Sequence, residues 1–342
     1  MGVFMPDTRT LPSPQTVRDQ TDHLYQRMRR VVPEAEWALY APVIARIQQL
    51  KQERNAVILA HNYQTPEIVH GVADIGGDSL ALARRAATVE ADIIVLAGVH
   101  FMAETAKILN PGRTVLIPDQ RAGCSLAESI TAADVQLLRQ RYPGVPVVTY
   151  VNTSAEVKAA SDICCTSSNA VEVVNALGSN RVIFLPDRYL AHYVASQTDV
   201  EIIAWEGQCE VHERFTGTEI RSYRDRHPDL VVIAHPECPP DVLDAADFVG
   251  STAQMIDRLN HVPKSRVLMV TECSMSDNVA DAHPDKDFVR PCNLCPHMKR
   301  ITLDGILQCL ETGNHEITLD PAIADKARQA VERMLALSTG GR

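Results

Sequence analysis

The sequence has no uninterrupted apolar run of the roughly 18 residues that a membrane-spanning helix needs. Its first residues, MGVFMPDTRTLPSPQ, lack the apolar core and small-residue cleavage site of a secretory signal. Basic residues number 33 against 43 acidic ones, for a net charge of −10, whereas a nucleic-acid binder carries a basic face. We therefore expect a cytoplasmic protein that binds neither membrane nor nucleic acid.

The common nucleotide-binding and metal-binding motifs are also missing. No P-loop, GxGxxG or HExxH pattern stands out, and the CxxxCxxC pattern of radical-SAM enzymes is absent. The chain does contain nine cysteines. Because the cytosol keeps thiols reduced, structural disulfides are not expected. Some of these cysteines are therefore candidate metal ligands.

Short apolar runs alternate with helical stretches after residue 54. Runs of Val, Ile and Leu between helices are typical of parallel strands that are covered on both faces. The expected strands lie at 56–60, 92–98, 114–118, 145–151, 181–186, 200–205, 230–235 and 266–271. Helices are expected over 16–32, 34–54 and 321–337, and a disordered tail over 1–15. The fold class is thus predicted to be α/β.

Three stretches of the chain follow the same order of elements, at 60–79, 149–168 and 234–252. Each contains a strand end, polar residues, a helix, an aspartate and a loop that ends in Ser or Thr. The aspartates are Asp74, Asp162 and Asp247, which stand 88 and 85 positions apart. A supersecondary unit repeated three times predicts a pseudo-threefold arrangement with a site where the units meet.

We accordingly expect three αβα three-layer domains, each with a short parallel sheet. The expected boundaries are an N-terminal tail with helices over 1–54, units over 55–130, 131–215 and 216–300, and C-terminal helices over 301–342.

Three cysteines follow the period of the repeat. Cys124, Cys209 and Cys295 stand 85 and 86 positions apart, each after the last expected strand of its unit. Three thiolates on a common axis suit an iron–sulfur cluster with one iron free of protein ligands, or a zinc ion with water. The alternative is that they are incidental loop cysteines. Cys292 lies three positions before Cys295, so the third ligand stays ambiguous and the pair could instead form a redox disulfide.

Polar residues lie at the carboxyl end of the first expected strand of each unit, where parallel α/β sheets bind ligands. These are His61 and Tyr63, Tyr150 and Asn152, and His235 and Glu237. His, Tyr and Glu can move protons, and Asn can orient a carbonyl or carboxylate. A second loop in each unit contains GGDS (76–79), CTSSN (165–169) or GST (250–252). Such loops bind anions at helix N-termini or simply cap the helix.

The segments AHNYQTPEI, AGCSLA, YVNTSAEVKA, CTSSNAV, WEGQCEVHE, AHPEC, ADFVGST and CPHMKRITL together resemble the quinolinate synthase family, from about residue 55 to 310. The resemblance implies a transferase that condenses iminoaspartate with dihydroxyacetone phosphate to quinolinate, a precursor of NAD. The reaction releases phosphate and two waters. The resemblance also implies three αβα domains around one 4Fe-4S cluster per chain, with one iron that lacks a cysteine ligand and acts as a Lewis acid.

Carried over to this sequence, the resemblance implies that Cys124, Cys209 and Cys295 are the cluster ligands. Cys295 is preferred over Cys292 because it stands in the family's Cys-Pro-x-Met context. The implied substrate-binding residues are His61, Ser79, Tyr150, Asn152, Ser167, His235, Glu237 and Thr252. The implied catalytic residues are Tyr63, Tyr150, His235 and Glu237.

Two other functions are compatible with the cysteines alone. An iron–sulfur sensor or electron carrier predicts a fourth protein ligand and has no need of acid–base residues. A zinc hydrolase with three cysteines predicts zinc instead of iron. If the protein is a synthase, an aspartate-oxidising enzyme is the expected supplier of iminoaspartate, with transient hand-over as a possible arrangement.

Overall fold

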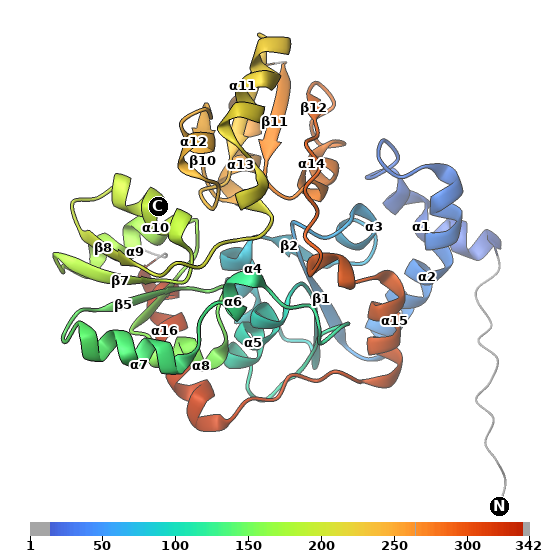
Figure 1. Ribbon diagram of the computed structural model, residues 1–342. Coiled ribbons are helices and arrows are strands. Elements are labelled where there is room, and N and C mark those ends of the chain that lie inside the picture. Colours follow the sequence, from blue (N-terminus) through green and yellow to red (C-terminus); the bar gives the residue numbers. More distant parts are fainter. Residues whose placement is uncertain (1–13, 264, 338–342) are drawn as a thin grey trace, which may run out of the picture.

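The computed structural model describes residues 14–263 and 265–337, which form three α/β units around a common centre (Figure 1). Each unit contains one parallel sheet of four strands, and the strand orders are β2-β1-β3-β4, β6-β5-β7-β8 and β10-β9-β11-β12. The first, second and third units therefore share one topology. This confirms the predicted α/β class and the threefold repeat.

The order of elements is also the same in the three units. Unit one contains α2 (Glu34–Glu53), β1 (Ala56–His61), α3 (Pro66–Val69), β2 (Ile75–Gly77), α4 (Ser79–Ala86), β3 (Ile93–Ala97), α5 (His100–Leu109) and β4 (Thr114–Leu116). Unit two contains α7 (Ala132–Arg141), β5 (Val147–Tyr150), α8 (Ala155–Ala160), β6 (Ile163–Cys165), α9 (Ala170–Ala176), β7 (Arg181–Leu185), α10 (Arg188–Ser196) and β8 (Glu201–Ala204). Unit three contains α11 (Gly217–Arg226), β9 (Leu230–Ala234), α12 (Pro240–Leu243), β10 (Phe248–Val249), α13 (Thr252–His261), β11 (Arg266–Val270), α14 (Ser274–Val279) and β12 (Asp287–Val289).

A short helical turn follows the last strand of each unit. These turns are α6 (Ser125–Glu128), η1 (His212–Arg214) and η2 (Met298–Arg300). The three sheets lie within the expected ranges 55–130, 131–215 and 216–300. In unit one, however, α2 takes the place that α7 and α11 take in the other units. The domain boundaries themselves stay a prediction.

All eight predicted strands are present, and four more were missed. The missed strands are β2, β6, β10 and β12. Each has only two or three residues and lies at the edge of its sheet, paired on one side. The apolar pattern could not find them because each contains only one Val, Ile or Leu: their sequences are IGG, ICC, FV and DFV.

The predicted helix over 16–32 is too long. Helix α1 spans Pro14–Tyr25, and residues 26–32 form turns. Several N–H groups in these turns donate to the carbonyl three residues earlier instead of four, as Met28 N–H does to Tyr25 O (3.0 Å). Met28 is fully buried, and the ring of Tyr25 stacks on that of Trp37 at 5.1 Å. The chain reverses here so that α1 can pack against α2. Of the disordered tail predicted over 1–15, residues 1–13 lie outside the described part of the chain.

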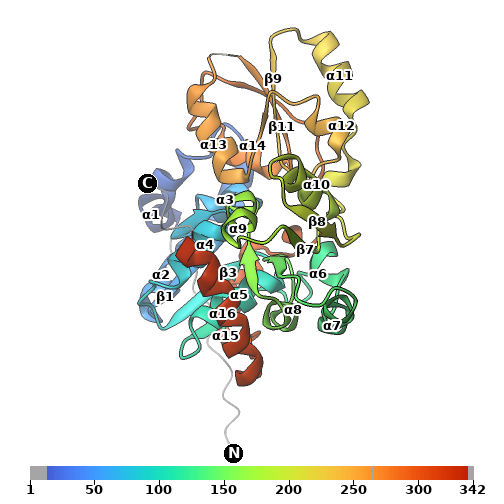
Figure 2. The ribbon, with the colours of Figure 1, turned by 90° about the vertical axis from the view of Figure 1, so that its left-hand side faces the viewer.

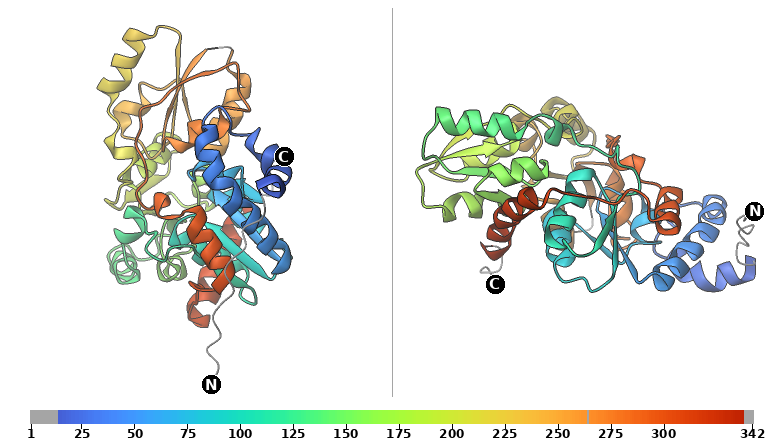
Figure 3. Two further views of the ribbon diagram at one scale, coloured as in Figure 1. Left: turned by 90° about the vertical axis from the view of Figure 1, so that its right-hand side faces the viewer. Right: turned by 90° about the horizontal axis from the view of Figure 1, so that it is seen from below.

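The C-terminal helices close the molecule against two of the units. Helix α15 (Leu303–Thr312) lies along α2, and α16 (Pro321–Leu337) covers unit two at α8 and β6 (Figures 2 and 3). The predicted helix over 321–337 is therefore confirmed. No helix in the described part of the chain is both long and apolar enough to cross a membrane.

The repeated aspartates have one structural role in all three units. In unit two, Asp162 Oδ2 accepts the Val147 N–H at 2.7 Å, and the Asp162 N–H donates to Val147 O at 3.0 Å. Arg139, on the helix before the strand, pairs with the same carboxylate at 3.0 Å. The corresponding sets are Lys51, Ile58 and Asp74 in unit one, and Arg224, Val232 and Asp247 in unit three. Each aspartate thus joins a helix, a central strand and an edge strand.

We expect Asp162→Ala to lower the free energy of unfolding by about 1–3 kcal/mol, because the buried Val147 N–H loses its acceptor. Urea unfolding followed by circular dichroism measures this change. Asp199→Ala is the matched control, because Asp199 is exposed. Equal unfolding midpoints for the two variants would contradict the structural role of Asp162.

Candidate active site

One pocket lies where the three units meet, and all of the predicted site residues line it. Its walls include residues from the ends of the central strands, from the Ser/Thr loops and from the turns after the last strands. The predicted residues in these walls are His61, Tyr63, Ser79, Cys124, Tyr150, Asn152, Ser167, Cys209, His235, Glu237, Thr252 and Cys295. Residues from three distant segments of the chain thus line one cavity.

Hydrogen bonds between units surround this pocket. Asn62 Nδ2 donates to Thr252 Oγ1 at 3.2 Å and joins units one and three. Ser168 Oγ donates to Asp78 Oδ2 at 2.7 Å and joins units one and two. His235 Nε2 lies 3.2 Å from Ser167 Oγ and joins units two and three. Each pair of neighbouring units is therefore connected directly at the site.

The pocket-lining hydroxyls in two of the Ser/Thr loops are not used as helix caps. The side chain of Asp78 caps α4 and that of Ser251 caps α13, while Ser79 and Thr252 are the first helical residues and line the pocket. Capping the helix and lining the pocket are thus divided between neighbouring residues. Of the described residues lining the pocket, none is lysine or arginine. An anion here would be held by hydroxyl, imidazole and backbone N–H donors.

The three predicted cysteine ligands have the same local geometry. The sulfur of Cys124 accepts hydrogen bonds from the backbone N–H groups two and three positions further along the chain, in Leu126 and Ala127. The sulfurs of Cys209 and Cys295 do the same with their own neighbours at those positions. Such N–H groups stabilise a thiolate and are found around cluster sulfurs. The donor set of three thiols therefore fits an iron–sulfur cluster.

Burial raises the pKa of each of these thiols, that of Cys124 to about 12. Without a metal the three sulfurs keep their protons, so binding a metal must release them. Cys292 is different because it is exposed, does not line the pocket and hydrogen bonds with the thiol of Cys273. The five cysteines that do not follow the repeat period, Cys164, Cys165, Cys238, Cys273 and Cys309, are buried as expected.

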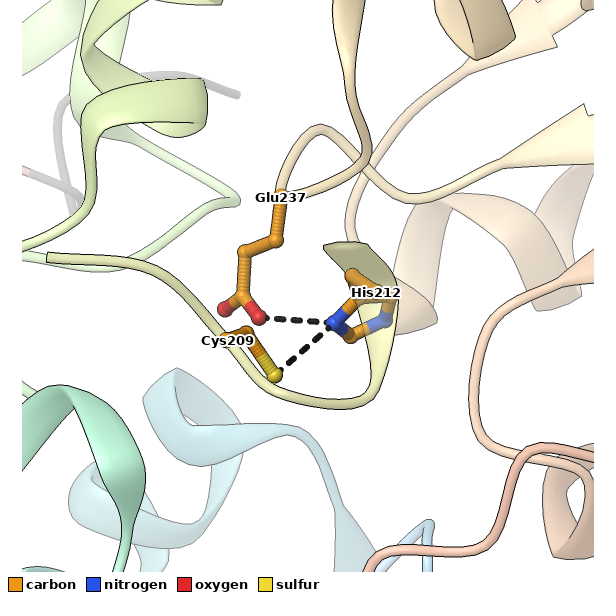
Figure 4. A group of neighbouring side chains, drawn as sticks. All are labelled: Cys209, His212 and Glu237. Atoms are coloured by element: carbon orange, nitrogen blue, oxygen red, sulfur yellow. Dashed lines mark hydrogen bonds and ion pairs between the residues drawn. The ribbon is translucent and has the colours of Figure 1, made fainter. Parts of the chain in front are cut away.

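His212 joins one of these thiols to an acidic residue. Its Nδ1 lies 2.8 Å from Glu237 Oε2 and 3.2 Å from Cys209 Sγ (Figure 4). These three side chains offer ligand atoms within 4.8 Å of one another, which is close enough to hold a metal ion. Sequence reasoning missed His212 because it lies after the strand-end positions that the repeat marked. Its place three residues after Cys209, in the same turn, was the available signal.

The histidines and the glutamate of the site differ in whether they carry a charge. Burial lowers the pKa of His61 to about 4 and that of His235 to about 3, so both imidazoles are neutral at pH 7. Burial acts to raise the pKa of Glu237, but the His212 and His235 rings and hydrogen bonds from His212 and Tyr150 outweigh it and hold the pKa at about 2. Tyr150 donates to Glu237 Oε1 at 2.6 Å. The site thus combines a buried carboxylate with neutral histidines and phenols.

An ion pair between a buried glutamate and a half-buried lysine holds two loops of the site together. The Glu272 carboxylate accepts the Cys295 N–H at 3.3 Å and pairs with Lys299 Nζ at 2.9 Å. Lys299 Nζ also donates to the carbonyl of Tyr63 at 2.7 Å. The loop that carries Cys295 is therefore fixed against the loop that carries Tyr63.

Asn152 contributes a buried side-chain oxygen that has no partner among the described residues, which suits ligand binding.

Fold and site together define an α/β protein with three equivalent units and a central pocket suited to a metal cofactor and proton transfer. Residues 45–336 match the family described as quinolinate synthetase A protein. The chain belongs to this family, which is a family of enzymes.

Individual relatives are similar over nearly the whole chain. "Quinolinate synthase 2" of Mesorhizobium japonicum is 66% identical, over 94% of this chain and 99% of its own. "Quinolinate synthase" of Agrobacterium fabrum is 66% identical, over 94% of each chain. "Quinolinate synthase" of Caulobacter vibrioides is 54% identical, over 98% of this chain and 90% of its own. The family resemblance seen in the motifs is therefore confirmed.

The low pKa values of His61 and His235 predict acid sensitivity. An unfolded histidine has a pKa near 6.5, so the unfolded chain binds more protons as the pH falls below that value. We expect each histidine to remove about 1 kcal/mol of stability between pH 7.5 and 5.5. The difference in urea unfolding between wild type and His235→Gln over this pH range measures the effect. The variant should show the smaller loss, and an equal loss would contradict the prediction.

Proposed function

We propose that the protein is a quinolinate synthase of NAD biosynthesis. It condenses iminoaspartate with dihydroxyacetone phosphate to quinolinate, and releases phosphate and two waters. The observation that carries this proposal is the pocket itself, where three thiols with matching N–H donors face a buried carboxylate, neutral histidines and phenols. Family membership supports it.

The cofactor that suits this set is one 4Fe-4S cluster per chain, held by Cys124, Cys209 and Cys295. When bound, such a cluster supplies a Lewis-acidic iron that polarises an oxygen or nitrogen of the substrate. The three cysteines are evenly spaced in the sequence, and one comes from each unit. This supports a cluster on the three cysteines over a single metal ion held by Cys209, His212 and Glu237.

The substrates are a dicarboxylate and a phosphate ester, and both are anionic. We assign their binding to neutral donors, because the pocket offers hydroxyls and imidazoles where lysine and arginine would be common. The proposed neutral donors are His61, Ser79, Tyr150, Asn152, Ser167, His235 and Thr252, and the proposed set also includes the acceptor Glu237; all of them line the pocket.

Proton transfer is assigned to Tyr63, Tyr150, His235 and Glu237. Glu237 already accepts the Tyr150 hydroxyl at 2.6 Å, so Tyr150 can pass a proton to the carboxylate or receive one from it. Burial raises the pKa of both phenols well above the usual value, which keeps them protonated as proton donors. His235, being neutral, can accept a proton from substrate.

Replacing one cysteine at a time tests the cluster ligands. Cys295→Ser should abolish both bound iron and quinolinate formation, whereas Cys292→Ser, three positions away, should retain both, because its thiol faces Cys273. Iron content and Mössbauer spectra of anaerobically purified, iron-57-enriched protein measure the first effect. Quinolinate is assayed with dihydroxyacetone phosphate and iminoaspartate supplied by an aspartate-oxidising enzyme, the proposed upstream partner.

The outcomes separate this proposal from the alternatives. Full turnover by a variant that lacks all three cysteines and the cluster would contradict it. Zinc in place of iron would favour a hydrolase. Glu237→Gln should remove most of the turnover but leave the iron bound, whereas an electron carrier or sensor would be indifferent to that change.

A further inference from the structure

Lys158 is a fully buried lysine behind the wall of the pocket. It belongs to α8, and its Nζ donates to the backbone carbonyl of Thr153, the residue after Asn152. The same Nζ lies 5.5 Å from the centre of the Phe101 ring. Asn152 and Phe101 both line the pocket, whereas Lys158 does not. The ammonium group therefore stands directly behind two residues of the pocket wall.

The charge of Lys158 has no anionic partner in direct contact. The other two buried lysines of the described chain, Lys51 and Lys286, pair with aspartates at 2.7 and 2.5 Å. Lys158 makes no ion pair within 4.0 Å with any described residue. Burial lowers the pKa of Lys158, and Glu104 on α5 opposes this shift from beyond contact distance. A buried ammonium without a contacting partner is costly, so a further negative charge nearby would stabilise it.

An anion bound in the pocket would supply that negative charge. No lysine or arginine is among the described residues that line the pocket. Lys299 also stands behind the wall, but it pairs with the Glu272 carboxylate at 2.9 Å. Of these two lysines, Lys158 is the one that no carboxylate neutralises by contact. Its attraction for an anion acts through the wall because the effective dielectric constant of a protein is far below that of water.

Both Lys158 and Glu104 also hold the turn between β5 and α8, which carries Asn152. Lys158 donates to the Thr153 carbonyl, and Glu104 Oε2 accepts the Ala155 N–H at 3.0 Å. Removing either side chain therefore changes the turn as well as the charge. The opposite signs of the two charges separate these effects, because a damaged turn weakens ligand binding in both cases.

We propose that Lys158 is the counter-charge for an anion bound in the central pocket, and that it attracts the carboxylate or phosphate group of this anion through the wall. The inference rests on the proposed function, whose substrates and product are anions of this class. It adds to the neutral donors of the wall a positive charge that does not touch the ligand. Lys158 is thus a residue for affinity and not for proton transfer.

Lys158→Met and Glu104→Gln should have opposite effects on anion binding. Lys158→Met removes the positive charge, so the Kd values for quinolinate and for inorganic phosphate should rise by about 10- to 50-fold. Glu104→Gln keeps an acceptor for the Ala155 N–H but removes the negative charge, so both Kd values should fall by about 3- to 10-fold. Isothermal titration calorimetry of iron-loaded protein under anaerobic conditions measures them. If both variants bind more weakly, the two residues act through the turn and the proposal is wrong.

Combining Lys158→Met with Glu104→Gln covers the case in which Lys158→Met alone does not fold. The combined variant has neither buried charge, so it leaves no carboxylate unpaired in the interior. Relative to Glu104→Gln, it should bind both anions about 10- to 50-fold more weakly, since these two proteins differ only at Lys158. Equal Kd values for the two would overturn the proposal.

Lys286→Met is the matched control. Lys286 is also buried and donates to a backbone carbonyl, that of Val262 at 2.8 Å, but it pairs directly with Asp285 and Val262 does not line the pocket. This variant should leave the Kd values for both anions unchanged.

A second comparison varies the charge of the ligand. Picolinate has the ring of quinolinate with one carboxylate fewer, so Lys158→Met should weaken picolinate binding by a smaller factor than quinolinate binding. An equal factor for both ligands would indicate a change in pocket shape and would contradict the proposal.

The binding measurements also separate this inference from the proposed function. If the wild type binds both anions but forms no quinolinate, the proposed function fails, while the Kd values still decide the role of Lys158. If the wild type binds neither anion, the role assigned to Lys158 is wrong.

Discussion

The central constraint on this structure is that three units bring three thiols to the wall of one pocket. Each of Cys124, Cys209 and Cys295 stands on a short turn after the last strand of its unit. Each sulfur is held by backbone N–H groups at the same two positions along the chain. A single unit could offer only one such sulfur. Three copies of one topology, packed with the ends of their strands toward the centre, provide all three without a long loop.

The meeting of the three units also places a charged carboxylate in a buried pocket. The pocket buries the Glu237 carboxylate, and a buried charge is costly unless other groups satisfy it. Here Tyr150 and His212 each bind one carboxylate oxygen. Because no lysine or arginine is among the described residues of the wall, the carboxylate stays charged through hydrogen bonds and imidazoles. A network of this kind is rigid because each member is held by the next.

Connections between the units keep this network in place. Glu272 and Lys299 link the Cys295 loop to the Tyr63 backbone, so Cys295 of unit three and Tyr63 of unit one are joined directly. The hydrogen bond between the hydroxyls of Tyr63 and Thr271, a residue that follows β11, does the same for the Tyr63 side chain. The site is thus positioned by contacts between units more than by any one unit.

The sequence by itself determined the class of fold, the threefold repeat and twelve of the residues that line the pocket. Uninterrupted apolar runs reveal central strands, and a constant period places Cys124, Cys209 and Cys295 at equivalent positions, so both can be deduced from local pattern. The tertiary structure alone decided which side chains touch. His212 and Thr271 carry no repeat signal, because they are joined only when units two and three pack together. Short edge strands were likewise settled by pairing with a neighbour, since backbone hydrogen bonds leave little trace in so few residues.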